Sequence, residues 1–224
     1  MATQSARQPD PDPDLDADAT VDVESDREPA SEPGPEPAPE PEIDPELLAR
    51  RREALRYVRK LGDPVLRARA IEVDRFDDRL REQIERMGVL MDDAMGVGLA
   101  ATQLGLLQRL LVYRVQQESP VIALVNPELE WSGDEQEVME EGCLSLPGVH
   151  VDVERSIRVR VRARDEYGEP VLVEASGLEA RVIAHEMDHL DGVLILDRTT
   201  REQRREAMRL MREAAAAAAA GDGP

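Results

Sequence analysis

Apolar positions along the chain alternate between helical spacing and short runs. In one stretch, five apolar side chains lie three or four residues apart, which is the spacing of one face of an amphipathic helix. They are Phe76, Leu80, Ile84, Met87 and Met91. The same kind of pattern predicts a second helix over about 178–190 and a last helix over about 200–220.

Four shorter stretches are apolar or alternating and are bounded by turn residues. Runs of this length and composition predict strands. They cover residues 110–113, 121–125, 157–161 and 171–173. Short strands separated by turns favour antiparallel pairing. We therefore expect an α+β fold in which antiparallel strands pack around one central helix, 178–190, with a further helix at the C-terminal end.

Composition divides the chain into three parts. Residues 1–42 contain nine of the sixteen prolines and thirteen acidic against two basic residues, which is −11 of the net charge of −20. Such a segment cannot bury enough apolar surface to offset the entropy cost of ordering, so we expect a disordered acidic tail. It has neither the basic start nor the apolar stretch of a signal peptide. Residues 43–199 fit one domain, and 200–224 are expected to form an arginine-rich helix and an alanine-rich tail.

The predicted helix 178–190 carries two of the three histidines, within His185-Glu186-Met187-Asp188-His189. Positions i and i+4 share one face of a helix, so both histidines can bind one metal ion. Glu186 then lies beside the ion as a general base for water. A histidine pair can also share a solvated face by accident, but the apolar residues around this motif indicate a half-buried helix.

The third ligand decides which class of hydrolase the motif represents. A metzincin protease would have a histidine where this chain has Ile195, so that class is excluded. A zincin with a glutamate ligand would need one of Glu202, Glu206 or Glu213, but these lie in an arginine-rich stretch that we expect to face solvent.

Cys143 is the better candidate, and it is the only cysteine of the chain. A lone cysteine is often a small buried hydrophobe, but Gly142 before it and Pro147 after it indicate a specific loop. One thiolate and two imidazoles also leave a fourth tetrahedral position open, as catalytic zinc sites require.

A third motif is rich in small residues. Residues 96–103, Gly-Val-Gly-Leu-Ala-Ala-Thr-Gln, suit a backbone segment that lines a substrate groove. They do not form a phosphate loop, because Ala101 replaces the third glycine and no Gly-Lys-Ser/Thr follows. Gln103 is placed to direct its side-chain amide into the site.

Together, the segments 96–103, 141–145 and 185–189 resemble the three motifs of the peptide deformylase family, in the same order. The resemblance extends from about Glu53 to Arg212 and makes 43–199 a deformylase-like catalytic domain. It implies a metal-dependent hydrolase that removes the formyl group from the N-terminal formyl-methionine of newly synthesised polypeptides and releases formate. One departure is Ala184, where many members have glutamine.

The resemblance also implies roles for individual residues. Glu186 would take the proton of water and pass it to the leaving amine. The Gln103 amide and the Leu144 backbone N–H would stabilise the oxyanion. One divalent ion is implied, Fe²⁺ first, with Zn²⁺, Ni²⁺ or Co²⁺ as alternatives. Its ligands would be Cys143, His185 and His189.

The methionine side chain of the substrate requires an apolar pocket, with a neighbouring backbone segment to align the peptide. Glu141 and the stem of Arg181 would lie near the rim. An ion pair between Asp188 and Arg155 would support the site. The substrate-binding residues implied by the resemblance are Val97, Gly98, Glu141, Leu178, Arg181 and Val182.

The expected partners are nascent N-formyl-methionyl polypeptides and, by resemblance, the ribosome, through basic side chains of the last helix. A solvated helix face is the alternative for that helix. The single cysteine fits a reducing cytoplasm. No apolar run approaches the roughly 18 residues of a membrane span, and only five aromatics argue against base stacking. We therefore expect a cytoplasmic monomer that binds neither membrane nor DNA.

Two other functions remain open from the sequence. A non-catalytic relative would keep the metal as a structural or peptide-binding element, although it would be expected to lose Glu186, Gln103 or a ligand. An endopeptidase, the function that the helix motif alone suggests, would cleave internal peptide bonds.

Overall fold

The computed structural model describes residues 44–221. The predicted disordered tail, 1–42, and the end of the alanine-rich tail, 222–224, lie outside the described residues. No helix in the described part is both long and apolar enough to cross a membrane. The helices are α1 (Pro45–Ala54), α2 (Asp78–Asp93), α3 (Leu178–Leu190), α4 (Ile195–Arg198) and α5 (Arg201–Gly221), with 3₁₀ turns η1 (Pro64–Arg67) and η2 (Ala101–Leu104).

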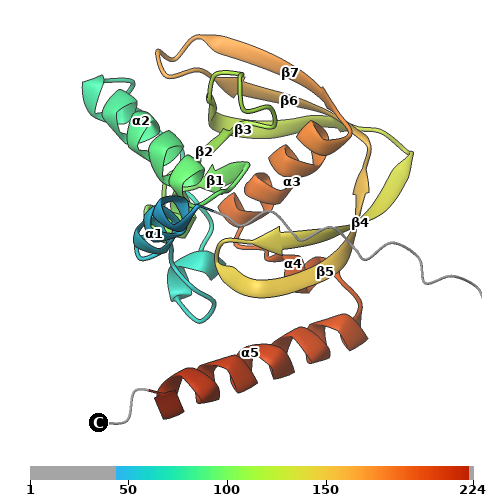
Figure 1. The fold of residues 1–224 in the computed structure, drawn as a ribbon. Coiled ribbons are helices and arrows are strands. Elements are labelled where there is room, and N and C mark those ends of the chain that lie inside the picture. Colours follow the sequence, from blue (N-terminus) through green and yellow to red (C-terminus); the bar gives the residue numbers. More distant parts are fainter. Residues whose placement is uncertain (1–43, 222–224) are drawn as a thin grey trace, which may run out of the picture. The chain divides into compact units, whose positions relative to one another are not determined.

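Within residues 44–221, seven strands form two antiparallel sheets (Figure 1). The larger sheet has the order β1-β2-β3-β6-β7, and β4 and β5 form a separate hairpin. Helix α3 contacts β1, β2 and β7 on one side and β5 on the other, which confirms the central helix expected from the sequence. The strands are β1 (Gly98–Ala100), β2 (Leu110–Tyr113), β3 (Ile122–Ser132), β4 (Gln136–Cys143), β5 (Leu146–Ser156), β6 (Arg158–Arg164) and β7 (Pro170–Ser176).

The hairpin β4–β5 corrects the sequence analysis, which assigned Cys143 to a loop. Cys143 ends β4 and pairs with Leu146 of β5 after a register shift at Gly142. The pattern of β4 conceals the strand, because residues 136–140 are all exposed and its apolar residues, Val138 and Met139, are adjacent instead of alternating. Helix α1 was also not predicted; half of its ten residues are charged and only Ala54 is buried.

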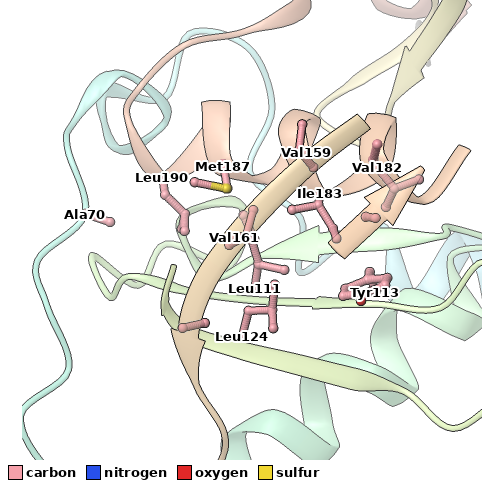
Figure 2. Close-up of a cluster of buried hydrophobic side chains, with 14 residues drawn as sticks. Ala70, Leu111, Tyr113, Leu124, Val159, Val161, Val182, Ile183, Met187 and Leu190 are labelled. Atoms are coloured by element: carbon pink, nitrogen blue, oxygen red, sulfur yellow. The ribbon is translucent and has the colours of Figure 1, made fainter. Parts of the chain in front are cut away.

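The apolar face of α3 fixes the helix against the larger sheet (Figure 2). Ile183, Met187 and Leu190 pack among side chains that include Leu111 and Val161, and all but Met187 are essentially inaccessible to solvent. Burying each such side chain stabilises the fold by roughly 1.5–3 kcal/mol. The opposite face of α3, which carries the histidines, is thereby held toward the hairpin β4–β5.

Helix α5 packs on the outer side of the hairpin β4–β5. Ala207 is buried, and Met208 and Met211 pack against a cluster that includes Val151 and Val153 of β5. The Gln203 side chain accepts a hydrogen bond from the backbone N–H of Asp152 at 2.9 Å. The arginine-rich helix is therefore anchored to the domain by an apolar face.

Candidate metal centre and active site

Two elements bring the three predicted metal ligands together. Helix α3 carries His185 and His189 on one face, and the end of β4 carries Cys143. One ligand atom from each lies within 4.8 Å of the other two. The His189 Nε2 and Cys143 Sγ atoms are 3.2 Å apart. Two imidazoles and a sulfur that converge in this way fit a tetrahedral metal ion with one position open.

The thiol of Cys143 lies in surroundings that favour its metal-binding form. Burial by itself raises the pKa of Cys143, but the imidazoles of His189 and His185 bring that pKa well below its usual value. The thiolate is the form that binds metal. The surroundings of Cys143 therefore favour the thiolate, which together with two imidazoles suits a cation.

Glu141 orients His185 from behind. The Glu141 Oε2 atom lies 3.0 Å from His185 Nδ1, which leaves Nε2 of that ring for the metal. Burial raises the pKa of Glu141, but hydrogen bonds with His185 and Arg155 lower it to about 2. Glu141 and Arg181 both line the cavity that is described below. Arg181 Nη1 donates to Glu141 Oε1 at 2.8 Å. Their charged ends therefore bind each other instead of extending from the rim of the cavity.

Arg155 joins two buried carboxylates. It donates through Nε to Glu141 at 2.6 Å and through Nη1 to Asp188 at 2.9 Å, and its side chain is 7% exposed. The ion pair of Arg155 with Asp188 is therefore confirmed. Arg198, which the sequence analysis missed, also donates to Asp188, through Nε at 3.1 Å. This network fixes the side of α3 behind the ligands.

Glu186 points toward β1 and is 4% exposed. Its Oε2 atom has no hydrogen-bond partner among residues 44–221. Burial raises the pKa of Glu186, which suits a group that takes up and releases a proton. A Cβ atom at Gly98 would lie 2.5 Å from Glu186 Oε1. Glycine at this position therefore lets the β1 backbone approach the carboxylate.

The amide of Gln103 is held at both ends. Its Oε1 accepts from the Ala100 backbone N–H at 2.8 Å, and its Nε2 donates to Ser145 Oγ at 3.3 Å and lies 3.7 Å from Cys143 Sγ. The donor end thus faces the ligand set. Lys60 Nζ donates to the Leu144 carbonyl at 3.0 Å. No sequence signal identified Lys60, because its role depends on a contact across 84 residues.

One cavity of about 340 Å³ lies beside the ligands. All six substrate-binding residues implied by the resemblance line it, together with Gln103, Cys143, Leu144, His185 and Glu186. Arg51 and Leu55, from α1 and its C-terminal end, also line it and were missed because α1 was not predicted. The structure therefore brings the predicted residues together around one space, with only His189 buried behind it.

Comparison with known proteins agrees with this arrangement. The polypeptide deformylase family matches residues 55–205. A peptide deformylase of Acidothermus cellulolyticus is 50% identical over 161 residues, which cover 72% of this chain and 88% of that protein. A peptide deformylase of Thermotoga maritima is 49% identical over 147 residues, which cover 66% of this chain and 88% of that protein.

Solved structures show the same fold. A peptide deformylase from Synechococcus elongatus in complex with actinonin has a TM-score of 0.67 at 44% identity, covering 69% of this chain and 86% of that chain. The structure of the Thermotoga maritima peptide deformylase has a TM-score of 0.62 at 48% identity. The match covers 64% of this chain and 96% of that chain. The family match includes Cys143, His185 and His189, and the chain belongs to the polypeptide deformylase family.

Proposed function

We propose that Cys143, His185 and His189 hold the single metal ion with which this enzyme removes the formyl group from newly made polypeptides. Membership of the family gives the reaction. The observation that carries the assignment is the convergence of these three ligand atoms within 4.8 Å of one another, next to a cavity that Glu186 and Gln103 also line. When bound, a divalent ion supplies Lewis-acid chemistry and lowers the pKa of water.

Glu186 is the group that moves the proton. It takes a proton from the attacking water and delivers it to the amine that leaves as the formyl C–N bond breaks. Its buried position supports this role, because burial keeps the pKa of Glu186 above its usual value. The Glu186 Oε2 atom accepts no hydrogen bond from another described residue, so it is available to accept a proton.

Gln103 and Leu144 stabilise the oxyanion that forms from the formyl carbonyl. Preorganised donors of this kind contribute about 3–4 kcal/mol each in comparable acyl-transfer sites. Preorganisation of Gln103 is supported by the bond from the Ala100 N–H to its side-chain amide oxygen. Lys60 binds the Leu144 carbonyl, which belongs to the peptide group after the one that carries the Leu144 N–H. The Gln103 donor is thus positioned before substrate binds.

The methionine side chain of the substrate enters the apolar part of the cavity, between Val97, Leu178 and Val182. Val97 is 45% exposed and Leu178 is 51% exposed, although both line the cavity. A bound side chain would remove this apolar surface from water. Strand β1 is an edge of the larger sheet, so the backbone at Gly98 is available to align an extended peptide. Glu141 and Arg181 support this wall from within.

The metal is Fe²⁺ by resemblance, with Zn²⁺, Ni²⁺ or Co²⁺ as alternatives. One thiolate and two imidazoles are compatible with each of these ions. Metal analysis of protein purified without oxygen, together with activity after reconstitution with each ion, identifies the native one.

Metal removal tests the assigned reaction. Incubation with a chelator should reduce formate release from formyl-Met-Ala more than about 100-fold, because the Lewis acid is lost, and adding back a divalent ion should restore it. Formate release that persists in metal-free protein would contradict the assignment. Cleavage of internal peptide bonds would favour an endopeptidase, and metal binding without formate release would favour a non-catalytic relative.

We further propose that the enzyme is a cytoplasmic monomer whose helix α5 contacts the ribosome. Arg201, Arg205 and Arg212 are exposed on α5 and form no ion pair with another residue in the range 44–221. Unpaired guanidinium groups on an anchored helix suit RNA phosphates.

Charge substitution is a sharper test of this contact than truncation, because removing α5 would expose the apolar cluster around Ala207. Changing Arg201, Arg205 and Arg212 to alanine should weaken ribosome binding at least about tenfold and reduce its salt dependence. Activity on formyl-Met-Ala should not change. The matched control changes Arg160, Arg162 and Arg164 of β6 to alanine, and equal ribosome affinity of the two triple variants would overturn the proposal.

A further inference from the structure

A second cavity of about 480 Å³ lies beside α2 and shares no lining residue with the active site. Its charge contrasts with that of the chain, whose net charge is −20. Four arginines line it, and Glu82 is the one acidic residue among the described residues that do so. The arginines are Arg56, Arg59, Arg79 and Arg86.

These arginines are only partly neutralised by their neighbours. Arg56 pairs with Glu53 at 3.1 Å, and Arg59 approaches Asp63 at 3.7 Å. Arg79 and Arg86 form no ion pair with any residue in the described part of the chain. Clustered guanidinium groups that lack carboxylate partners favour an anion, and their planar fork matches a phosphate group.

The backbone is adapted to keep Arg59 in place. A Cβ atom at Gly105 would lie 2.8 Å from Arg59 Nε and 3.1 Å from its Nη2. Gly105 also has a φ of +85°, a conformation that favours glycine. The guanidinium of Arg59 therefore packs directly against a turn, which restricts its position at the cavity wall.

Gln83 supplies a further donor without a partner. Its Nε2 atom is buried and makes no hydrogen bond with residues 44–221. Gln83 lies between Arg79 and Arg86 at four- and three-residue spacing along α2, so the three side chains share one face of the helix. A buried amide N–H without an acceptor is unfavourable. The Nε2 atom is inaccessible in the free protein, so a ligand oxygen satisfies it once the Gln83 side chain turns toward the cavity that it lines.

The cavity also has features that suit a planar ring. The Arg86 guanidinium lies over the Tyr57 ring, 5.4 Å from the ring centroid. Part of the wall is apolar, formed by Met87, Leu90 and Leu104. A volume of this size is within the range of small-molecule sites, and aromatic and guanidinium planes both stack on nucleobases.

We propose that this cavity binds one nucleotide, with its phosphate at the arginines and Gln83 and its base beside Tyr57. The nucleotide can be free in solution or part of an RNA strand, since both present the same phosphate and base. The scarcity of aromatics in the chain argues against stacking along a whole strand, but one ring is sufficient for one nucleotide.

Titration of the metal-loaded full chain with AMP, adenosine and a ten-nucleotide single-stranded RNA tests the proposal. AMP should bind, and adenosine should bind at least about tenfold more weakly because it lacks the phosphate. Changing Arg79 and Arg86 to alanine should weaken AMP binding at least about tenfold. RNA that binds more tightly than AMP and competes with it identifies a strand as the source, whereas RNA that binds no tighter identifies a free nucleotide.

Two matched variants separate this site from general charge effects. Changing Arg160 and Arg162 of β6 to alanine removes the same charge elsewhere and should leave AMP affinity unchanged. Gln83→Leu should weaken AMP binding severalfold while the melting temperature of the free protein stays the same or rises, because an unpaired buried amide is removed. Absent AMP binding, equal losses in the two double-arginine variants, or adenosine binding as tight as AMP would each overturn the proposal.

Discussion

Glu186→Gln is expected to lower kcat for formate release about 1000-fold, because general acid–base groups contribute roughly 10²–10⁴-fold. Glutamine keeps the shape of the side chain but cannot accept a proton at neutral pH. The proposed ligands Cys143, His185 and His189 are unchanged, so the metal content of the purified variant should equal that of the parent. A single-turnover assay with formyl-Met-Ala and metal analysis of the same sample measure both quantities.

The matched control is Glu179→Gln on the same helix. The Glu179 Oε1 atom accepts a hydrogen bond from the Tyr113 hydroxyl at 2.9 Å, and a glutamine oxygen can accept the same bond. This variant should keep kcat within about twofold, because it removes a charge from α3 without removing the proton-transfer group. If Glu186→Gln loses its metal as well as its activity, Glu186 supports the ion instead of moving a proton.

The helix at the centre of the fold was predictable from sequence because its apolar residues and its histidine pair share the helical period. Apolar spacing predicts residues 178–190, and the structure gives Leu178–Leu190. The histidine pair uses the same period, so helix and ligand geometry follow from one pattern. Cys143 was predicted as a ligand but was assigned to a loop, because the strand that carries it is largely exposed and has no alternating apolar residues.

Strand β5 did have a detectable signal. Val149, Val151 and Val153 alternate with His150, Asp152 and Glu154, and the structure buries the three valines. Alternation of this kind is typical of a half-buried strand. This alternation predicts the strand that pairs with β4, which carries Cys143.

The second layer of the site could not be predicted by periodicity. Glu141 contacts His185 across 44 residues and Arg155 across 14, and these contacts depend on the register of β4 with β5 and on how α3 packs over them. The pairing of Glu141 with Val151 sets which side chains of the hairpin face α3. Register is a tertiary property, so the sequence identified Glu141 as a residue of the site without indicating its contacts.

Arg155→Met is expected to destabilise the fold by about 3–5 kcal/mol, the usual cost of leaving buried charges without their partner. Glu141 loses both the Nε and Nη2 bonds to this guanidinium, at 2.6 and 2.9 Å, and Asp188 keeps only Arg198. Denaturant unfolding of the metal-loaded protein measures the loss. Arg160→Met, at an exposed pair with Glu174, should change stability by no more than about 0.5 kcal/mol.

The pH dependence of this loss distinguishes a charge effect from a packing effect. In the parent, hydrogen bonds from His185 and Arg155 outweigh burial and lower the pKa of Glu141 from 4.5 to about 2. A carboxylate whose pKa is lower in the folded protein than in the unfolded chain stabilises the fold at pH values above its unfolded-state pKa. That stabilisation disappears as the pH falls through the folded-state pKa. The stability difference between the parent and Arg155→Met should therefore narrow as pH falls from about 5 toward 2.

Metal affinity provides the final discrimination, because Glu141 holds the ring of His185 in its ligating orientation. Loss of groups that orient a ligand typically lowers metal affinity about 10–100-fold. Arg155→Met should show this loss under conditions where it remains folded, since Glu141 loses its two hydrogen bonds to Arg155 and is then held beside His185 by Arg181 alone. Adding Glu141→Gln should recover part of the stability by removing a buried carboxylate that has lost two of its four hydrogen bonds and keeps only those with Arg181 and His185. Stability that recovers without metal affinity would assign Arg155 to orientation of the ligand, and metal affinity unchanged in both variants would limit Arg155 to the support of the fold.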